Sequence, residues 1–518
     1  MTRKKLPIGI QTFAKIREDD YYYVDKTPFA LRLIAEGTHY FLSRPRRFGK
    51  SLFLDTLAEL FAGNEPLFRE LHCHDTWDWS ITYPVIRLSF GGGVLHSRAE
   101  LDAKIRHLLR VSQDRLGLRC TDPSDTAICF AELIEAAAAT FGQRVVVLVD
   151  EYDKPILDNL TCPDIAREMR DGLRNLYSVI KDNDAHIKFA FLTGVSKFSK
   201  VSIFSGLNNL RDITVSAEYS ALCGYTETNL DTVFAPELDG LDRSQVRAWY
   251  NGYNWTGEAV YNPFDLLLLF QEREFRPYWF ETGTPTFLVD LLTTRQTWLP
   301  ELGQLESDAE LLGSFDVDRI GTEALMFQSG YLTIDEKIDL GGSQFFRLRY
   351  PNREVCQSLH ASLLQRWTAD AGTSVRQRIA LFRLLRARDF AALHTLFTAF
   401  FAGIPHDWHR NNPLAEYEGY YASVFYAYFA ALGLDIRLED TTSHGRIDMA
   451  VLFDAQVFLF EFKVVELHPR GRALAQLQQK HYADKYRAHA APIHLIGVEF
   501  SKDSRSVVGF EVETLAPL

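Results

Sequence analysis

The segment between His39 and Phe61 constrains the fold of this chain more than any other. A short apolar run at residues 39–42 precedes the loop at residues 44–51, and the apolar positions of residues 52–61 then recur at helical spacing. This pattern predicts a strand, a tight loop and a helix that begins at Gly49-Lys50-Ser51. Because the first N–H groups of a helix have no partner within it, such a loop would cradle phosphate groups.

The loop carries the residue types that phosphate binding needs. We expect the backbone at Gly49 to approach the phosphates, Lys50 to reach the outer phosphates as a point charge, and the Ser51 hydroxyl to ligate Mg²⁺. Arg46 and Arg47 would add positive charge beside a triphosphate, although a solvated basic turn would look the same. The usual spacing wants a glycine where Arg44 stands, and Arg44 could narrow the loop.

A second segment supplies the acids of a nucleotide site. Residues 145–149 are all valine or leucine, which favours a strand that is buried on both faces of a parallel sheet. Asp150 and Glu151 follow this strand, where open α/β sheets bind ligands. We expect Asp150 to hold Mg²⁺ through its water shell and Glu151 to orient the attacking water. A third strand, residues 187–194, contains Thr193, which could report on the γ-phosphate.

Composition excludes several classes of protein. The chain has 518 residues, which is enough for several cores, and its net charge of −12 restricts any nucleic-acid contact to local patches. No signal-like N-terminus or apolar run of membrane length is present, so we expect a cytoplasmic protein without membrane contact. Six cysteines occur without a Cys-x-x-Cys pair, which suggests reduced thiols and neither a zinc site nor a disulfide framework. They are Cys73, Cys120, Cys129, Cys162, Cys223 and Cys356.

Two strands near the C-terminal end predict a hairpin with a carboxylate pair. Residues 445–453 and residues 456–464 have the pattern of two strands, and residues 454 and 455 form a plausible turn between them. In antiparallel register, position 453 faces 456 and Asp448 faces Glu461, with Cβ atoms about 5 Å apart. Lys463 shares the face of Glu461, whereas the phenylalanines at 460 and 462 point to the other side.

Facing carboxylates repel unless a cation lies between them. Mg²⁺ is held by one or two carboxylates, with water and phosphate as further ligands, and a lysine beside it could orient the attacking water. We therefore expect Asp448, Glu461 and Lys463 to form the D…E-x-K arrangement of nucleases, with Glu418 as a third acid that ligates the metal. The alternative is a surface hairpin with an exposed ion pair worth under about 1 kcal/mol. Residues 473–482 predict a helix with amides and Tyr482 facing this site.

Two groups of motifs carry a resemblance to known proteins. The first group is Leu6-Pro7-Ile8-Gly9-Ile10-Gln11, Tyr22-Tyr23-Val24-Asp25-Lys26-Thr27, Ser43-Arg44-Pro45-Arg46-Arg47-Phe48-Gly49-Lys50-Ser51, Asp150-Glu151-Tyr152-Asp153-Lys154-Pro155, Thr193-Gly194-Val195-Ser196-Lys197-Phe198-Ser199-Lys200 and Trp249-Tyr250-Asn251-Gly252-Tyr253, and the second is Gly445-Arg446-Ile447-Asp448 and Phe460-Glu461-Phe462-Lys463. The first group resembles the AAA-ATPase-like family of bacterial proteins, which commonly carries a C-terminal PD-(D/E)XK nuclease-superfamily domain, and the second group resembles that domain.

The resemblance covers nearly the whole chain and implies that the arginine-rich loop is a normal variant. Gln476 matches the family's helix position, whereas Gln478 has the spacing from Tyr482 seen in other nucleases of the superfamily, and both stay open.

We expect an α/β protein of five consecutive regions. They are a P-loop AAA-like ATPase domain (1–215), a helical lid (216–310), a winged-helix-like region (311–370), a helical connector (371–410) and a PD-(D/E)XK nuclease-like domain (411–518). Aromatic turns in the lid are expected to pack in its core rather than stack on bases. The winged-helix-like region could bind DNA, but for an acidic chain we favour a role in transmitting nucleotide state.

The leading hypothesis is a protein that binds and hydrolyses ATP and thereby controls a Mg²⁺-dependent nuclease domain acting on nucleic acid, with DNA favoured. A non-catalytic nucleotide switch or scaffold with a degenerate nuclease fold is the alternative. An ATPase that remodels while its nuclease fold only docks nucleic acid is a third possibility. ATP and Mg²⁺ are the expected cofactors, and a homo-oligomer is open.

Overall fold

The computed structural model divides the chain into two compact units. Unit 1 comprises Met1–Gly283 and Leu305–Asn352, and unit 2 comprises Thr284–Gln304 and Arg353–Leu518, so the chain passes between the units three times. This division differs from the predicted regions because residues 284–304 belong with the C-terminal part. The structure describes residues 3–198, 209–281, 286–295, 299–312, 321–367, 371–402, 417–442, 445–466, 468–504 and 506–517.

Unit 1 is built on a five-stranded parallel sheet with the order β2-β3-β4-β1-β5. The valines and leucine of β3 are at most 2% exposed, as expected for a strand covered on both faces. The apolar runs predicted as strands at 39–42, 145–149 and 187–194 are all strands. The sheet consists of β1 (His39–Ser43), β2 (Val85–Ser89), β3 (Val145–Asp150), β4 (Ile187–Gly194) and β5 (Arg211–Asp212).

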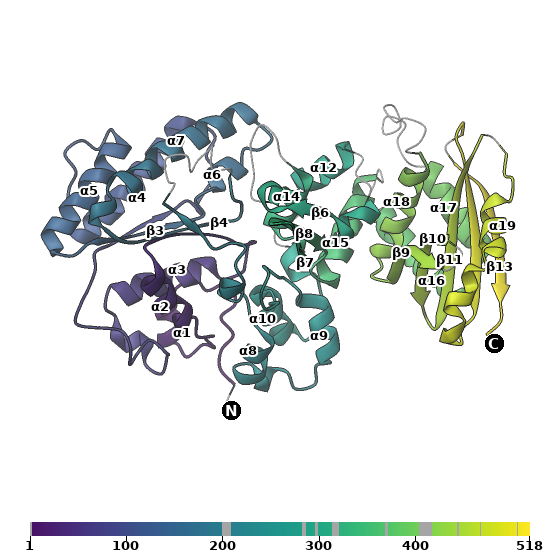
Figure 1. Cartoon of the computed structure of the whole chain (residues 1–518), viewed down its shortest axis with the longest axis horizontal. Helices are drawn as coiled ribbons and strands as arrows, with labels where there is room; N and C mark the ends of the chain where they lie inside the picture. The colour runs from purple at the N-terminus through teal and green to yellow at the C-terminus, as the bar shows by residue number, and fades with distance from the viewer. Residues whose placement is uncertain are drawn as a thin grey trace. The chain divides into compact units, whose positions relative to one another are not determined.

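Helices cover both faces of this sheet (Figure 1). One face carries α4 (Arg98–Leu116), α5 (Thr126–Phe141) and α7 (Pro163–Asp182), and the other carries α1 (Phe13–Glu18), α2 (Thr27–Glu36) and α3 (Lys50–Phe61). The short helix α6 (Lys154–Leu157) follows β3, and helix α3 begins at the predicted lysine. Both faces of the sheet are therefore covered, so we expect ligands at the carboxyl ends of its strands.

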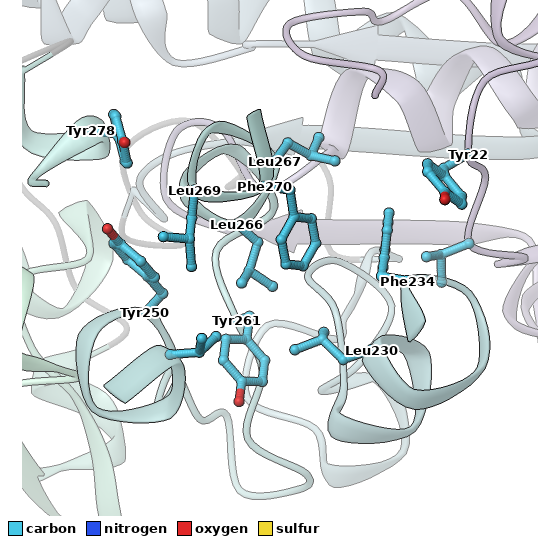
Figure 2. Packing of buried hydrophobic residues seen from close by; sticks show 12 residues of the cluster. Tyr22, Leu230, Phe234, Tyr250, Tyr261, Leu266, Leu267, Leu269, Phe270 and Tyr278 are labelled. Atoms are coloured by element: carbon cyan, nitrogen blue, oxygen red, sulfur yellow. The ribbon is translucent and has the colours of Figure 1, made fainter. Parts of the chain in front are cut away.

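A helical region follows β5 and has a core of its own (Figure 2). Leu266 and Phe270 of α10 (Pro263–Glu272) point toward Leu230 and Phe234, whereas Leu269 points toward Tyr250. The core also contains Tyr22 from the N-terminal segment. The aromatic residues of this region are thus core residues, as predicted for Tyr250 and Tyr278. Its helices are α8 (Glu227–Thr232), α9 (Arg243–Tyr250), α10 (Pro263–Glu272) and α11 (Tyr278–Glu281).

Unit 1 also contains a small antiparallel sheet with the order β6-β8-β7. The helix α14 precedes the β7–β8 hairpin, so the predicted succession of a helix and a β-hairpin is present. The elements are β6 (Glu306–Asp308), α13 (Ala309–Leu312), α14 (Thr322–Ser329), β7 (Thr333–Leu340) and β8 (Ser343–Arg349).

Unit 2 contains a five-stranded mixed sheet with the order β13-β12-β11-β10-β9. One face is aromatic: Phe460 and Phe462 pack against Phe425 of α18, with ring centroids 6.3 Å and 5.1 Å apart. The other face carries the alternate residues of β11 and is covered by α19. The strands are β9 (Asp435–Thr442), β10 (Gly445–Phe453), β11 (Gln456–Val465), β12 (Ile493–Ser501) and β13 (Val507–Leu515).

The helices of unit 2 are α12 (Thr286–Thr294), α15 (Arg353–Trp367), α16 (Ala371–Ala387), α17 (Phe390–Ala402), α18 (Tyr417–Ala430) and α19 (Arg472–Gln479). The predicted helix at 473–482 is shorter than expected, because α19 ends at Gln479. Tyr482 instead begins the 3₁₀ helix Tyr482–His489. No helix in the described residues is long and apolar enough to cross a membrane.

The expectation that no cysteines are paired is wrong at one place. Cys120 and Cys129 form a disulfide, with Cα atoms 5.2 Å apart. The spacing argument considered only Cys-x-x-Cys pairs, whereas the turn between α4 and α5 brings these two residues within the ordinary range for a disulfide. Cys73, Cys162, Cys223 and Cys356 are free.

Candidate functional site

The residues predicted to bind nucleotide lie at the carboxyl ends of the parallel strands in unit 1. Strand β4 lies between β1 and β3, with Thr193 beside Leu42 of β1 and Leu192 beside Val149 of β3. Because parallel strands end at the same edge, Thr193 lies between the loop after β1 and the acids at the end of β3. We call these residues the loop site: Arg46, Arg47, Gly49, Lys50, Ser51, Asp150, Glu151 and Thr193.

Two residues of the loop after β1 adopt left-handed backbone conformations. Gly49 has φ +93° and Arg47 has φ +70°, both in the left-handed region. A Cβ atom at Gly49 would meet no atom within 4 Å, so its backbone conformation, not crowding, favours glycine there. Arg47 adopts the same region at a cost of order 1 kcal/mol or more, which is typical of ligand-binding turns.

Lys50 folds back on its own loop. Its Nζ donates hydrogen bonds to the carbonyl oxygens of Arg44 and Pro45, both at 2.9 Å. The side chain is buried, and burial lowers its pKa, which the nearby Asp150 partly opposes. A phosphate group would replace two neutral acceptors by a charged one, which is the stronger partner. Ser51 follows in the first turn of α3.

Arg44 does not narrow the loop. Its side chain is fully buried, donates to the carbonyl oxygens of Thr214 and Tyr219, and stacks on Trp255 with the guanidinium carbon 3.9 Å from the ring centroid. Burial lowers its pKa to about 10. Arg44 therefore anchors the loop to the segment after β5, a role that its place in the motif did not reveal.

Two polar atoms at this edge are buried and have no hydrogen-bond partner in the described part of the chain: Asp150 Oδ1 and Thr193 Oγ1. Buried oxygens of this kind are costly unless a ligand, ion or water satisfies them. A hydrated Mg²⁺ beside Asp150 and a phosphate near Thr193 would do so. The residues present therefore fit a metal–nucleotide ligand.

Glu151 directly follows β3. It adopts φ +50°, and a Cβ atom at Gly91 would lie 3.1 Å from its Oε2 atom, so the carboxylate lies against the backbone after β2. Burial, followed by the charge of Asp150, raises the pKa of Glu151, whereas Lys50 and Arg46 oppose the shift. A carboxylate with a raised pKa can accept a proton from water.

Asp153 forms a buried hydrogen-bonded clamp that was not predicted from the sequence. Asp153 is buried and accepts hydrogen bonds from the backbone of Val195 at 3.0 Å and from the backbone and hydroxyl of Ser196, both at 2.6 Å. A side chain at Gly194 would collide with Asp153 and Tyr152. The clamp fixes the turn after β3 against the end of β4. Its only sequence signal is a third acid within four residues.

The two loop arginines differ in their surroundings. The guanidinium of Arg47 lies over Phe264 of α10, 4.7 Å from the ring centroid, so its side chain is engaged outside the loop. Both arginines are exposed, and the carbonyl oxygen of Arg46 accepts a hydrogen bond from Trp279 Nε1 at 3.1 Å. A Cβ atom at Gly330, which follows α14, would lie 2.7 Å from Pro45. The loop is therefore packed against α11 and the end of α14.

In unit 2 the predicted hairpin has the predicted register. Phe453 pairs with Gln456, and the antiparallel ladder continues to Met449 opposite Phe460. One step further, Asp448 Oδ2 accepts a hydrogen bond from the backbone N–H of Phe462 at 2.8 Å. Asp448 therefore reaches across to β11 between Glu461 and Lys463.

Glu461 is fully buried and binds two side chains. Its Oε1 atom accepts hydrogen bonds from Lys463 Nζ at 3.0 Å and from Gln476 Nε2 of α19. Gln478 instead donates to Glu513 at 2.6 Å on an exposed surface. The structure therefore places Gln476, not Gln478, beside the acids. We call Asp448, Glu461, Lys463 and Gln476 the carboxylate site.

Tyr482 borders the carboxylate site. Burial raises the pKa of Tyr482, and the charges of Glu461 and Asp448 raise it further. A Cβ atom at Gly445 would lie 2.5 Å from its hydroxyl, so glycine allows this close approach. Glu418 falls within α18, but its side chain lies outside the described residues.

Among the described side chains, no group of three or more acids, histidines or cysteines could hold a metal ion. Asp448 and Glu461 supply two carboxylates, which suits Mg²⁺ because that ion keeps several waters and needs only one or two protein carboxylates.

Comparisons with known proteins identify two domains in the chain. Residues 7–204 match the family described as Predicted AAA-ATPase, and residues 416–510 match the PD-(D/E)XK nuclease superfamily. A protein of Azotobacter chroococcum mcd 1, described as "Uncharacterized protein in vnfD 5'region", is 70% identical over 516 residues, which cover 99% of this chain and 100% of that protein. No solved structure matches the chain. The chain therefore belongs to the family of predicted AAA-ATPases that carry a PD-(D/E)XK nuclease-superfamily domain near the C-terminal end.

Proposed function

We propose that the chain binds and hydrolyses ATP at the loop site and thereby controls a Mg²⁺-dependent nuclease at the carboxylate site. The observation that carries the proposal is the meeting of Asp448, Glu461, Lys463 and Gln476 on one face of the unit 2 sheet. A fully buried acid, Glu461, next to a lysine favours a metal-dependent hydrolase over a surface hairpin.

At the loop site, Lys50 would exchange its two carbonyl partners for phosphate oxygens, and Ser51 and Asp150 would hold the hydrated metal. Glu151 would accept a hydrogen bond from the attacking water and take its proton as the oxygen attacks phosphorus. Thr193 would donate its hydroxyl to the terminal phosphate. These roles use the polar atoms that have no partner in the described part of the chain.

At the carboxylate site, Asp448 and Glu461 would ligate Mg²⁺, with Glu418 as a candidate third ligand. Bound Mg²⁺ would supply Lewis acidity toward the scissile phosphate. Lys463 would orient the water that attacks phosphorus while the bond to the leaving sugar oxygen breaks. Gln476 would hold the Glu461 carboxylate in place.

Control would start where the loop contacts its surroundings. Nucleotide binding at Lys50 alters a loop that packs on Trp279 and Gly330. The winged-helix-like segment that begins with α14 continues through β8 and enters unit 2 at Arg353. We propose that this covalent connection carries the nucleotide state to the nuclease.

A cleavage assay tests the nuclease proposal. Purified full-length protein with Mg²⁺ and ATP should cut labelled DNA, and Asp448→Ala should abolish cutting. Glu513→Gln is a matched control, because it removes a carboxylate of the same sheet outside the site. Equal cutting by wild type and Asp448→Ala would refute the assignment.

A phosphate-release assay separates hydrolysis from binding alone. Glu151→Gln should retain ATP and lose turnover. If wild type binds ATP without releasing phosphate, the chain is a nucleotide-dependent switch. Parallel assays on duplex DNA, single-stranded DNA and RNA decide the substrate, for which we propose DNA. We place the activity in the cytoplasm.

A further inference from the structure

We infer that Glu499 is a positioning residue that fixes helix α19 so that Gln476 reaches Glu461. This inference rests on the proposed nuclease function, because it concerns how the carboxylate site is held. Glu499 lies on β12, outside the motifs that identify the site, and its carboxylate binds the backbone at the start of α19.

Both carboxylate oxygens of Glu499 are committed to the start of α19. Oε1 accepts a hydrogen bond from the backbone N–H of Arg472 at 2.6 Å, and Oε2 accepts one from the backbone N–H of Arg470. The side chain is 2% exposed. The cap residue Gly471 has no side chain to satisfy these N–H groups. A buried carboxylate at this position therefore caps the helix and complements its dipole.

Glycine at position 497 lets the helix lie directly on the strand. A Cβ atom at Gly497 would collide with the backbone nitrogen of Leu474, in the first turn of α19. Gly497 is also the neighbour of Glu461 in the parallel register of β11 and β12. The helix backbone thus passes over the strand position adjacent to Glu461.

The anchor and the carboxylate site share one face of the sheet. Glu499 is the register partner of Lys463, so their side chains leave the sheet on the same side. Gln476 lies four residues after Arg472, about one helical turn from the N–H group that Glu499 holds. Fixing the first turn of α19 therefore fixes the position from which the Gln476 side chain reaches Glu461.

The geometry requires a carboxylate rather than an amide. Two N–H donors face two acceptor oxygens, and glutamine would present an NH₂ group to one of those donors. Glu499→Gln is nearly the same size but should release one of the two contacts. Aspartate keeps two acceptors on a side chain one methylene shorter, so Glu499→Asp should recover part of the loss.

The closing experiment measures Mg²⁺-dependent DNA cleavage by full-length wild type, Glu499→Gln, Gln476→Ala and the double variant. We expect Glu499→Gln to lower kcat about tenfold or more, with KM changed by less than about twofold. The double variant should be no slower than Gln476→Ala, because the two residues act as one unit. The control Glu513→Gln, whose carboxylate accepts a hydrogen bond from Gln478 on the exposed side of α19, should match wild type.

Wild-type kcat in Glu499→Gln, or rate losses that multiply in the double variant, would overturn the inference. Amide hydrogen exchange supplies a readout that does not need cleavage: residues 474–479 should exchange faster in Glu499→Gln, with β10 and β11 unchanged. Equal exchange would also overturn it. If Glu499→Gln does not fold, Glu499→Asp takes its place in both measurements. If wild type cuts no nucleic acid, the proposed function fails, and the exchange result alone decides the role of Glu499.

Discussion

The loop site and the carboxylate site differ in what their side chains contact. At the loop site, Asp150 Oδ1 and Thr193 Oγ1 are buried without partners in the described chain, and Lys50 is turned onto carbonyl oxygens. At the carboxylate site, Asp448 accepts an N–H group, and Glu461 binds Lys463 and Gln476. At the carboxylate site the side chains bind one another, whereas at the loop site Lys50 binds backbone carbonyl oxygens.

This difference predicts how each site responds to substitution. Removing a loop-site side chain should weaken ligand binding and leave the stability of the fold nearly unchanged. Removing a carboxylate-site side chain should leave a buried polar group without its hydrogen bond or counter-ion. This loss should lower the free energy of unfolding. The following variants test this difference between the two sites.

The largest effect is expected for Asp448→Asn. This change removes a carboxylate that we propose as a metal ligand, and we expect DNA cleavage to fall by about 1,000-fold, equivalent to about 4 kcal/mol in the transition state. Single-turnover cleavage measures it, with Glu513→Gln as the control. A loss below about tenfold would mean that Asp448 does not hold the metal.

Lys463→Met should lower the free energy of unfolding by about 3 kcal/mol, because it leaves the buried Glu461 without its cation. Denaturant unfolding measures the change. The double variant Glu461→Gln/Lys463→Met should regain most of this stability, since no buried charge is left. An equally unstable double variant would contradict the contrast between the sites.

Lys50→Ala should weaken ATP binding by about 100-fold, equivalent to about 2.7 kcal/mol. Calorimetry measures the affinity. The thermal midpoint without nucleotide should not fall, because burial lowers the pKa of Lys50 and its removal relieves that cost. A midpoint clearly below that of wild type would show that Lys50 stabilises the empty loop.

ATP turnover should fall as the pH falls through the raised pKa of Glu151, at a pH above the usual glutamate value of about 4.3. The folded state holds this proton more tightly than the unfolded state, so the group costs stability as the pH rises through this range. Glu151→Gln should remove that loss and raise the thermal midpoint at neutral pH. A lower midpoint for Glu151→Gln would reverse the sign and refute the assignment.

Trp279→Phe should have the smallest effect. It removes the hydrogen bond to the Arg46 carbonyl, worth about 1 kcal/mol, so ATP affinity should fall about fivefold. Trp79→Phe, which removes a comparable bond to His74 away from the loop, should leave the affinity unchanged.

Local patterns predicted the elements that carry both sites. The apolar run before Asp150 is β3, the helix begins at Lys50, and the hairpin register from Phe453 and Gln456 holds to Met449 and Phe460. These predictions succeed because they depend on period and on turn position, which neighbouring residues determine.

Long-range partners could not be predicted in the same way. The side chain of Arg44 packs against residues about 170 to 210 positions away, Tyr22 joins the core of the helical region, and Asp153 binds the segment after β4. Residues 284–304 join the C-terminal unit for the same reason. Such contacts depend on how elements pack, and a single sequence holds no local signal for them.

The central claim is that Asp448 and Glu461 bind a divalent ion without help from the loop site. Titration of full-length protein with Mn²⁺, an ion that prefers the same oxygen ligands as Mg²⁺, tests it directly in the absence of nucleotide. We predict that Asp448→Asn abolishes the site and that Asp150→Asn leaves it intact. Binding that survives in Asp448→Asn and disappears in Asp150→Asn would contradict the account.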